Sequence, residues 1–209
     1  MGLSTIQLVD YTCGMAQTVP RDSAATRRRL VQAAREEFTA RGIAGARVDR
    51  IAAAANANKA QIYHYFGDKD GLFSAVLESS TEEAVGAVPI DADDLPGYAA
   101  RLFDYHFDHP DLLRLVTWAR LEGRTTPSTQ AQRTTSYQRR ADAIKNAQRE
   151  GRVSTAFSAA QVLDMIESLA VGWTTTARGL LVDRGKLNRE RSAYRAGIAE
   201  AVQRIVRTG

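Results

Sequence analysis

The sequence of 209 residues contains a single cysteine, Cys13, and no long apolar run. One cysteine cannot form an internal disulfide, and it offers no thiolate cluster for zinc or an iron–sulfur centre. No window approaches the ~20 consecutive apolar residues that span a bilayer, and the first residues show no basic-then-apolar signal pattern. We therefore expect a cytoplasmic protein that has no membrane partner and carries no metal or cofactor.

A strict alternation of polar and apolar residues is also missing, which argues against strands. Apolar residues, 44% of the chain, recur instead at helical spacing along most of its length. We therefore predict an all-α fold.

The formal charge of +4 is unevenly distributed along the chain. Residues 20–66 carry nine Arg or Lys side chains against four acids, whereas residues 67–209 carry nineteen of each sign. A local positive field attracts polyanions such as nucleic acid or an anionic membrane surface. Basic runs are also common on plain solvated helix faces, so charge alone leaves both interpretations open.

The N-terminal part predicts four helices, at about 23–42, 48–55, 59–65 and 68–84. Asn56 interrupts the pattern after the second helix, where a tight turn needs the left-handed conformation that asparagine tolerates. Asn58 suits the N-cap of the third helix, and Ile62 faces inward. Two short helices around a tight turn form a helix-turn-helix, in which one helix braces on the DNA backbone and the next enters the major groove.

The rest of the chain also predicts helices. Residues 98–105 and 110–119 keep the helical period, residues 123–136 suggest a long connection, and residues 137–150 suggest a polar helix. Ser158 and Gln161 have the spacing of a capping box that opens a helix whose stripe continues to Leu180, and a last stripe begins at Tyr194. We predict an extension over 1–22, which we expect to be mobile, a DNA-binding domain over 23–70 and a regulatory domain over 71–209; translation could start at Met1 or Met15.

Several segments resemble the TetR (tetracycline-repressor-like) family of transcriptional regulators. These are Thr26-Arg27-Arg28-Arg29-Leu30, Val48-Asp49-Arg50-Ile51-Ala52, Ile62-Tyr63-His64-Tyr65-Phe66 and Lys69-Asp70-Gly71-Leu72. The resemblance covers about fifty residues, and beyond them it rests on helical make-up and length alone. It implies a homodimer in which each subunit presents one helix-turn-helix to a palindromic operator in double-stranded DNA.

The resemblance implies DNA contacts by Lys59, Gln61, Tyr63, His64 and Lys69. We add Asn58 to this candidate set, and Arg47, whose charge can replace a phosphate contact. Chemistry agrees, because lysine can contact phosphate or guanine, glutamine can pair with adenine, and tyrosine offers a hydroxyl to the backbone. Core packing is the alternative for the tyrosines and is the one we favour for Tyr65. Where the family has a hydroxyl residue at the start of the second helix, this chain has Ala46 and Arg47. For Arg27, Arg28 and Arg29, DNA contact and a solvated helix start remain equal alternatives.

The two terminal helices are the candidates for subunit pairing, since two apolar stripes from each subunit would be buried in a symmetric four-helix interface. The candidate interface residues are Val162, Ile166, Leu169, Trp173, Tyr194, Ile198, Val202 and Ile205. Packing within one subunit is the alternative.

A small organic effector would suit a mostly apolar cavity with a few polar groups. The candidate lining residues are Tyr98, Tyr105, His106, Trp118, Arg120, Tyr137 and Met165. Asp104, His106, Asp108 and His109 suggest metal ligands, but neighbouring residues diverge around a helix, so we predict no metal there.

Together these features predict a ligand-responsive DNA-binding regulator, most simply a repressor that an effector releases from its operator. One alternative is an architectural DNA-binding protein without an effector. Another is an all-α enzyme. The sequence argues against an enzyme, because it shows no Ser, His and Asp in the order of a catalytic triad, no phosphate-binding glycine-rich loop and no histidine pair at metal-ligand spacing.

Overall fold

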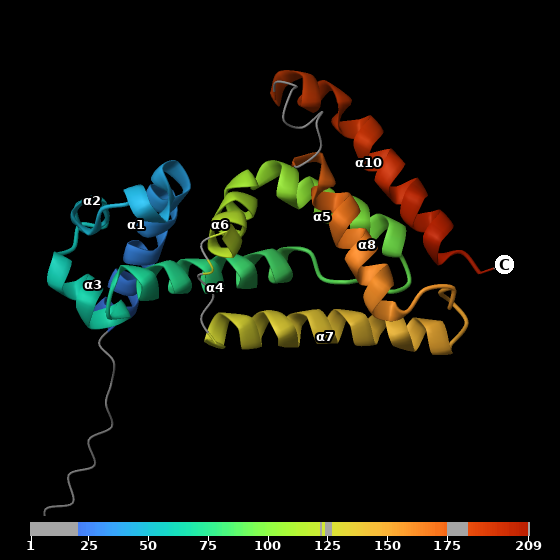
Figure 1. The fold of residues 1–209 in the computed structure, drawn as a ribbon, viewed down its shortest axis with the longest axis horizontal. Coiled ribbons are helices and arrows are strands. Elements are labelled where there is room, and N and C mark those ends of the chain that lie inside the picture. The colour runs from blue at the N-terminus through green and yellow to red at the C-terminus, as the bar shows by residue number, and fades with distance from the viewer. Residues whose placement is uncertain (1–20, 122, 124–126, 175–183, 209) are drawn as a thin grey trace, which may run out of the picture.

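The computed structural model describes residues 21–121, 123, 127–174 and 184–208, and within these ranges it is helical with no strand. This confirms the predicted all-α class (Figure 1). The helices are α1 (Arg21–Gly45), α2 (Val48–Ala54), α3 (Lys59–Phe66), α4 (Lys69–Ala87), α5 (Leu95–Asp108), α6 (Pro110–Leu121), α7 (Pro127–Arg149), α8 (Ala159–Val171), the short 3-10 helix η1 (Gly172–Thr174) and α10 (Arg184–Val206).

A first hydrophobic core joins α1, α2, α3 and the beginning of α4. Phe38 and Phe73 lie at its centre, with ring centroids 5.1 Å apart in an edge-to-face arrangement. Ile51 and Ile62 anchor the two short helices in this core, and both are fully buried. Full burial of such a side chain contributes about 1.5–3 kcal/mol, so these anchors fix how α2 and α3 sit on α1.

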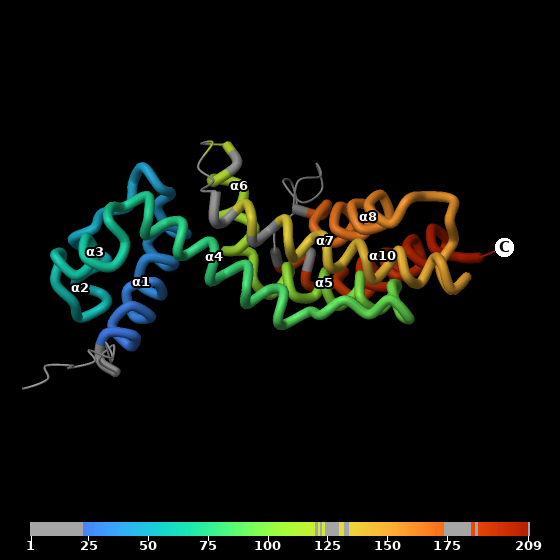
Figure 2. Tube along the Cα trace, turned by 90° about the horizontal axis from the view of Figure 1, so that it is seen from below, coloured from blue at the N-terminus to red at the C-terminus, as the bar shows by residue number. Residues whose placement is uncertain are grey.

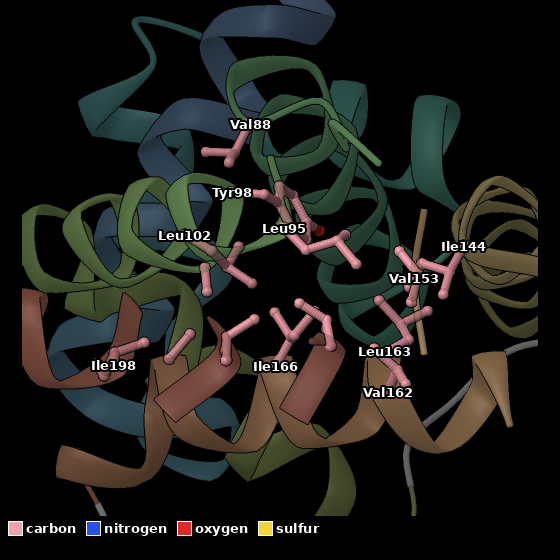
Figure 3. Close-up of a cluster of buried hydrophobic side chains, with 14 of the residues drawn as sticks. Val88, Leu95, Tyr98, Leu102, Ile144, Val153, Val162, Leu163, Ile166 and Ile198 are labelled. Atoms are coloured by element: carbon pink, nitrogen blue, oxygen red, sulfur yellow. The ribbon is translucent and has the colours of Figure 1, made fainter. Parts of the chain in front are cut away.

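A second core lies between α5, α7, α8 and α10. Figure 3 shows side chains that fill it, among them Tyr98, Ile144, Leu163 and Ile166. The C-terminal helix α10 packs chiefly along α5.

Helix α4 connects the two cores (Figure 2). Its first turns place Leu72 and Leu77 in the first core, while Val88, just beyond its end, belongs to the second. Helix α6 also contributes Leu115 and Ala119 to the first core. The packing thus crosses the boundary that we predicted at residue 70, and the division into domains stays a prediction.

Some helix limits differ from the predicted ones. Helix α1 begins at Arg21, two residues before the predicted start, and Gly42 (φ 69°) breaks its helical geometry where a stop was predicted, before a further turn to Gly45. The remainder of the predicted extension, residues 1–20, lies outside the described residues.

The predicted long connection over 123–136 is wrong from Pro127 onward, because α7 begins there. Proline suits the first turn of a helix, where its missing N–H would have no partner. The hydroxyls of Thr134 and Thr135 donate to the carbonyls of Gln130 and Ala131, at 2.8 and 3.0 Å, so this polar stretch is compatible with a helix.

The capping box that opens α8 is confirmed: the backbone N–H of Gln161 donates to Ser158 Oγ, and its side chain accepts from the backbone of Ser158. The helix ends at Val171, earlier than predicted, so Trp173 lies in η1, and Leu180 falls outside the described residues.

Candidate nucleic-acid interface and cavity

The turn between α2 and α3 has the predicted geometry. Asn56 adopts a left-handed conformation with φ 48°, and the N–H of Ala57 donates to the carbonyl of Ala52 at 2.9 Å. The turn brings the end of α2 against the start of α3, as in a helix-turn-helix.

Asn58 caps α3, as predicted, and Gln61 completes a capping box that we had not predicted. The N–H of Gln61 donates to Asn58 Oδ1 at 2.9 Å, and the N–H of Asn58 donates to Gln61 Oε1 at 3.0 Å. Gln61 Oε1 thus already accepts one bond within the capping box, which leaves one lone pair and the amide N–H groups of Gln61 for a base edge.

The outward face of α3 carries Lys59, Tyr63 and His64, all exposed; 47% of Tyr63 is accessible. Its inward face carries Ile62 and the half-buried Tyr65, which packs on the first core as favoured above. Polar side chains on the free face of a short helix, with apolar anchors opposite, fit insertion into a DNA groove.

Lys69 and Arg29 connect the helices around the helix-turn-helix. Lys69 is half-buried, and its Nζ donates to the carbonyl of Ala46 at 3.4 Å, so it joins the start of α4 to the start of α2. Arg29 donates to the carbonyl of Ala55 at 3.2 Å and to Thr26 Oγ1 at 3.0 Å, which gives it a structural role. The guanidinium of Arg27 lies 5.3 Å from the ring centre of Phe66.

Glu37 of α1 supplies the cap that α2 lacks in its own sequence. Arg47 occupies the N-cap position and makes no side-chain cap bond, but its backbone N–H donates to Glu37 Oε1 at 3.1 Å. The same oxygen accepts from Arg50 Nε at 2.7 Å. The bond from Arg50, the bond from the Arg47 backbone and the charge of Arg41 lower the pKa of Glu37 against the opposing effect of burial.

A cavity of about 480 Å³ lies between α4, α5, α6, α7 and α8. Of the predicted lining residues, Tyr98, His106 and Tyr137 line it. Its apolar wall is formed by side chains that were not predicted, among them Val85, Val88, Leu102, Leu112, Leu113 and Val116.

The polar end of the cavity consists of residues from α5, α7 and α8. Arg140, missed in the sequence, forms an ion pair with Glu167 and donates to the hydroxyl of Tyr98 at 3.5 Å. Tyr137 donates to Asp164 Oδ1 at 2.9 Å, and burial followed by this bond raises its pKa. Because the cation of Arg140 is balanced inside the wall, the polar end is not strongly charged.

Of the other predicted lining residues, Tyr105, Trp118 and Met165 do not line this cavity. Trp118 packs on the first core, where a Cβ at Gly42 would lie 3.7 Å from its ring. Tyr105 stacks with His109 at 4.5 Å between ring centres, and Met165 is half-buried on α8. The side chain of Arg120 lies outside the described part of the chain.

The two acids of the candidate metal cluster, Asp104 and Asp108, form ion pairs with arginines. Asp104 accepts from Arg191 at 2.9 Å and from Arg195 at 2.7 Å, and Asp108 accepts from Arg191 at 2.7 Å. Across the described ranges no group of three or more histidine, cysteine or acidic side chains is placed to hold a metal ion. No described helix is both long enough and apolar enough to cross a membrane.

Four of the predicted interface residues belong to the interior of a single chain. Val162, Ile166, Ile198 and Val202 are at most 7% exposed, because each faces the second core; we therefore assign them to that core and not to a subunit interface. The helical spacing correctly predicts two apolar stripes, but it does not reveal what covers them.

The other four predicted interface residues, Leu169, Trp173, Tyr194 and Ile205, are half-buried at the edge of the second core. Trp173 packs on Phe107 at 5.1 Å between ring centres. Leu169 and Tyr194 line a shallow, mostly apolar groove between α8 and α10.

An all-α chain with a helix-turn-helix at one end and a ligand-sized cavity in a helical body defines a DNA-binding regulator. The N-terminal part, residues 30–76, matches the model of the bacterial regulatory proteins of the tetR family, and residues 94–204 match the tetracyclin repressor-like C-terminal domain. The chain therefore belongs to the TetR family: it is a helix-turn-helix transcriptional regulator and not an enzyme.

Relatives support this assignment over nearly the whole length. The chain is 40% identical to the HTH-type transcriptional repressor SCO4008 of Streptomyces coelicolor over 190 residues, 89% of this chain and 97% of that one. The crystal structure of a transcriptional regulator from the same organism, SCO4942, superposes with a TM-score of 0.70 at 38% identity and covers 87% of this chain and 98% of its own. GusR of Salmonella enterica shares the fold, with a TM-score of 0.64 at 18% identity over 91% and 98% of the two chains.

Proposed function

We propose that the protein is a homodimeric repressor that binds a palindromic operator and is released from it by a small organic molecule. The observation that carries the proposal is the free outward face of α3, with Lys59, Tyr63 and His64 exposed above a firmly packed Ile62. Two such helices, one from each subunit, would enter successive major grooves about 34 Å apart.

In this proposal the side chains of α3 have separate tasks. Lys59 and His64 face base edges or phosphates, and Tyr63 offers its hydroxyl to a phosphate. Arg47 takes the place of the usual hydroxyl contact through its charge, since its side chain is 67% exposed. Asn58 and Lys69 contribute mainly by fixing the starts of α3 and α4, because their polar atoms are engaged within the module.

Pairing of two subunits through α8 and α10 would cover the groove lined by Leu169 and Tyr194. An apolar groove along two neighbouring helices is the surface that a symmetric four-helix interface buries.

Helix α6 offers a route from the cavity to the DNA-binding module. Its Leu112 and Val116 line the cavity, whereas Leu115 lies in the first core. Its Asp111 accepts from Arg35 of α1 at 2.9 Å, and Arg35 also donates to Glu83 of α4 at 2.7 Å. A ligand that moves α6 would therefore change the position of α1. Such a ligand shifts the population between a conformation that binds DNA and one that does not.

The test is DNA binding measured by fluorescence anisotropy on a duplex selected from a random pool by the wild-type protein. We expect Lys59→Ala combined with Tyr63→Phe to weaken binding by roughly tenfold or more, because a phosphate or base contact is lost in each subunit. Lys145→Ala, which removes an exposed cation from α7, is the matched control. Equal affinity of the double variant and the control would contradict the proposed role of α3.

A further inference from the structure

One acidic side chain, Asp49, lies among the cations of the helix-turn-helix. Lys59 Nζ lies 3.0 Å from one oxygen of its carboxylate, and Arg47 Nη2 lies 4.0 Å from the other. Arg47 precedes α2, Asp49 stands in the first turn of α2, and Lys59 opens α3. The carboxylate thus connects the cations at the starts of both helices.

The ion pair itself adds little to folding stability. The side chains of Lys59 and Asp49 are 50% and 58% exposed, and ion pairs at such positions add little to stability. The start of α3 is already fixed by the capping box, and the start of α2 by Glu37. The hydrogen bond and charge of Asp49 nevertheless raise the pKa of Lys59, so the carboxylate acts on that ammonium group.

The position of Asp49 has a consequence for any DNA that meets α3, since its negative charge lies 3.0 Å from the ammonium group of Lys59 that would meet a phosphate. Lys59 must leave the carboxylate before it can neutralise a phosphate. Sequence-independent binding consists almost entirely of such neutralisation, whereas an operator adds hydrogen bonds to base edges. The Lys59–Asp49 pair therefore opposes the step on which sequence-independent binding depends.

We propose that Asp49 restrains sequence-independent DNA binding by holding Lys59. The inference rests on the proposed function, in that α3 must face DNA. Asp49 is therefore expected to weaken the binding of random-sequence DNA.

The experiment compares the full-length wild-type protein with Asp49→Asn on a random-sequence duplex over a series of salt concentrations. At low salt, Asp49→Asn is expected to bind on the order of fivefold more tightly, because an acid is removed beside the phosphates. The dependence of log Kd on log salt is expected to steepen by about 0.9 for each additional phosphate that a released Lys59 neutralises.

The matched control is Asp93→Asn, which removes another exposed carboxylate, one that pairs with Arg152 at the far end of the body. It changes the net charge by the same amount and is expected to leave binding of random DNA unchanged. Asp49→Ser, which also suits the first turn of a helix, serves as a second variant, and circular dichroism checks that both fold.

A Lys59→Gln background tests the route through Lys59. The effect of Asp49→Asn should largely disappear there, since no ammonium group remains to be released. If Asp49→Asn equals the wild type, or if its effect is undiminished beside Lys59→Gln, the inference is overturned. A wild-type protein that binds no duplex at all would instead overturn the proposed function.

Discussion

His106 lies on the wall of the cavity, and burial, with a smaller contribution from the charge of His109, lowers its pKa to about 4. The imidazole is therefore neutral at physiological pH. The cavity consequently presents no histidine cation to a ligand, and Arg140 with its partner Glu167 supplies its charged groups among the described lining residues.

The same burial predicts that stability depends on pH in a defined window. The unfolded chain takes up a proton on His106 near pH 6.5 and the folded chain only near pH 4, so protons favour unfolding between these values. The free energy of unfolding should fall by up to roughly 3 kcal/mol as the pH drops through this window. Urea denaturation of the wild type and of His106→Asn measures the effect, which the variant should lack.

His64→Asn removes an exposed imidazole and serves as the control for that experiment. It should keep the pH dependence of the wild type. A His106→Asn variant that loses stability as steeply as the wild type between pH 6.5 and pH 4 would show that His106 is not responsible.

At the scale of elements, α2 depends on a cap that comes from another helix. Glu37 receives the backbone N–H of Arg47 and the guanidinium of Arg50, and its side chain is 12% exposed. We expect Glu37→Gln to lower the free energy of unfolding at pH 7 by about 1–2 kcal/mol, the usual cost of a lost cap or charged hydrogen bond.

That difference should shrink in acid. Because the folded-state pKa of Glu37 is below its ordinary value of 4.5, the stabilisation is present above pH 4.5 and is lost as the pH falls through the folded-state pKa. Denaturation at pH 7 and again well below pH 4.5 measures both values. Glu36→Gln, a change to the exposed neighbour, is the control; the prediction fails if both variants behave alike.

The sequence was informative where structure is local. Asn56 and Asn58 fixed the turn and the cap because both act on backbone within a few residues. Glu37 was missed because its contact with α2 joins two helices, which a pattern along one segment does not reveal. The cavity was only partly predicted for the same reason. Helical spacing places Trp118 on an apolar face of its helix, but it does not show that this face packs on the first core.

At the scale of the molecule, the half-buried residues of α8 and α10 bear on assembly. Leu169 is partly accessible in a single chain and lines the groove beside Tyr194. If this groove pairs two subunits, Leu169→Lys places a charge in the interface, and we expect the dimer to dissociate into folded monomers. Sedimentation measures the assembly, and circular dichroism the fold.

Leu121→Lys is the control for this change, because Leu121 is 77% exposed on α6. It adds the same charge away from α8 and α10. A Leu169→Lys protein that sediments like the wild type would exclude the groove as the pairing surface.

Helix α4 spans the two cores, with Leu72 in one and Val88, just past its end, in the other. The residues assigned to DNA end at Lys69, and the cavity wall begins at Thr81. Among the described residues, none that lines the cavity thus belongs to α3. If the cavity takes an effector and α3 binds an operator, as proposed, substitutions in the cavity wall would change which compound is recognised without changing the DNA sequence that is bound, and the two specificities can evolve independently.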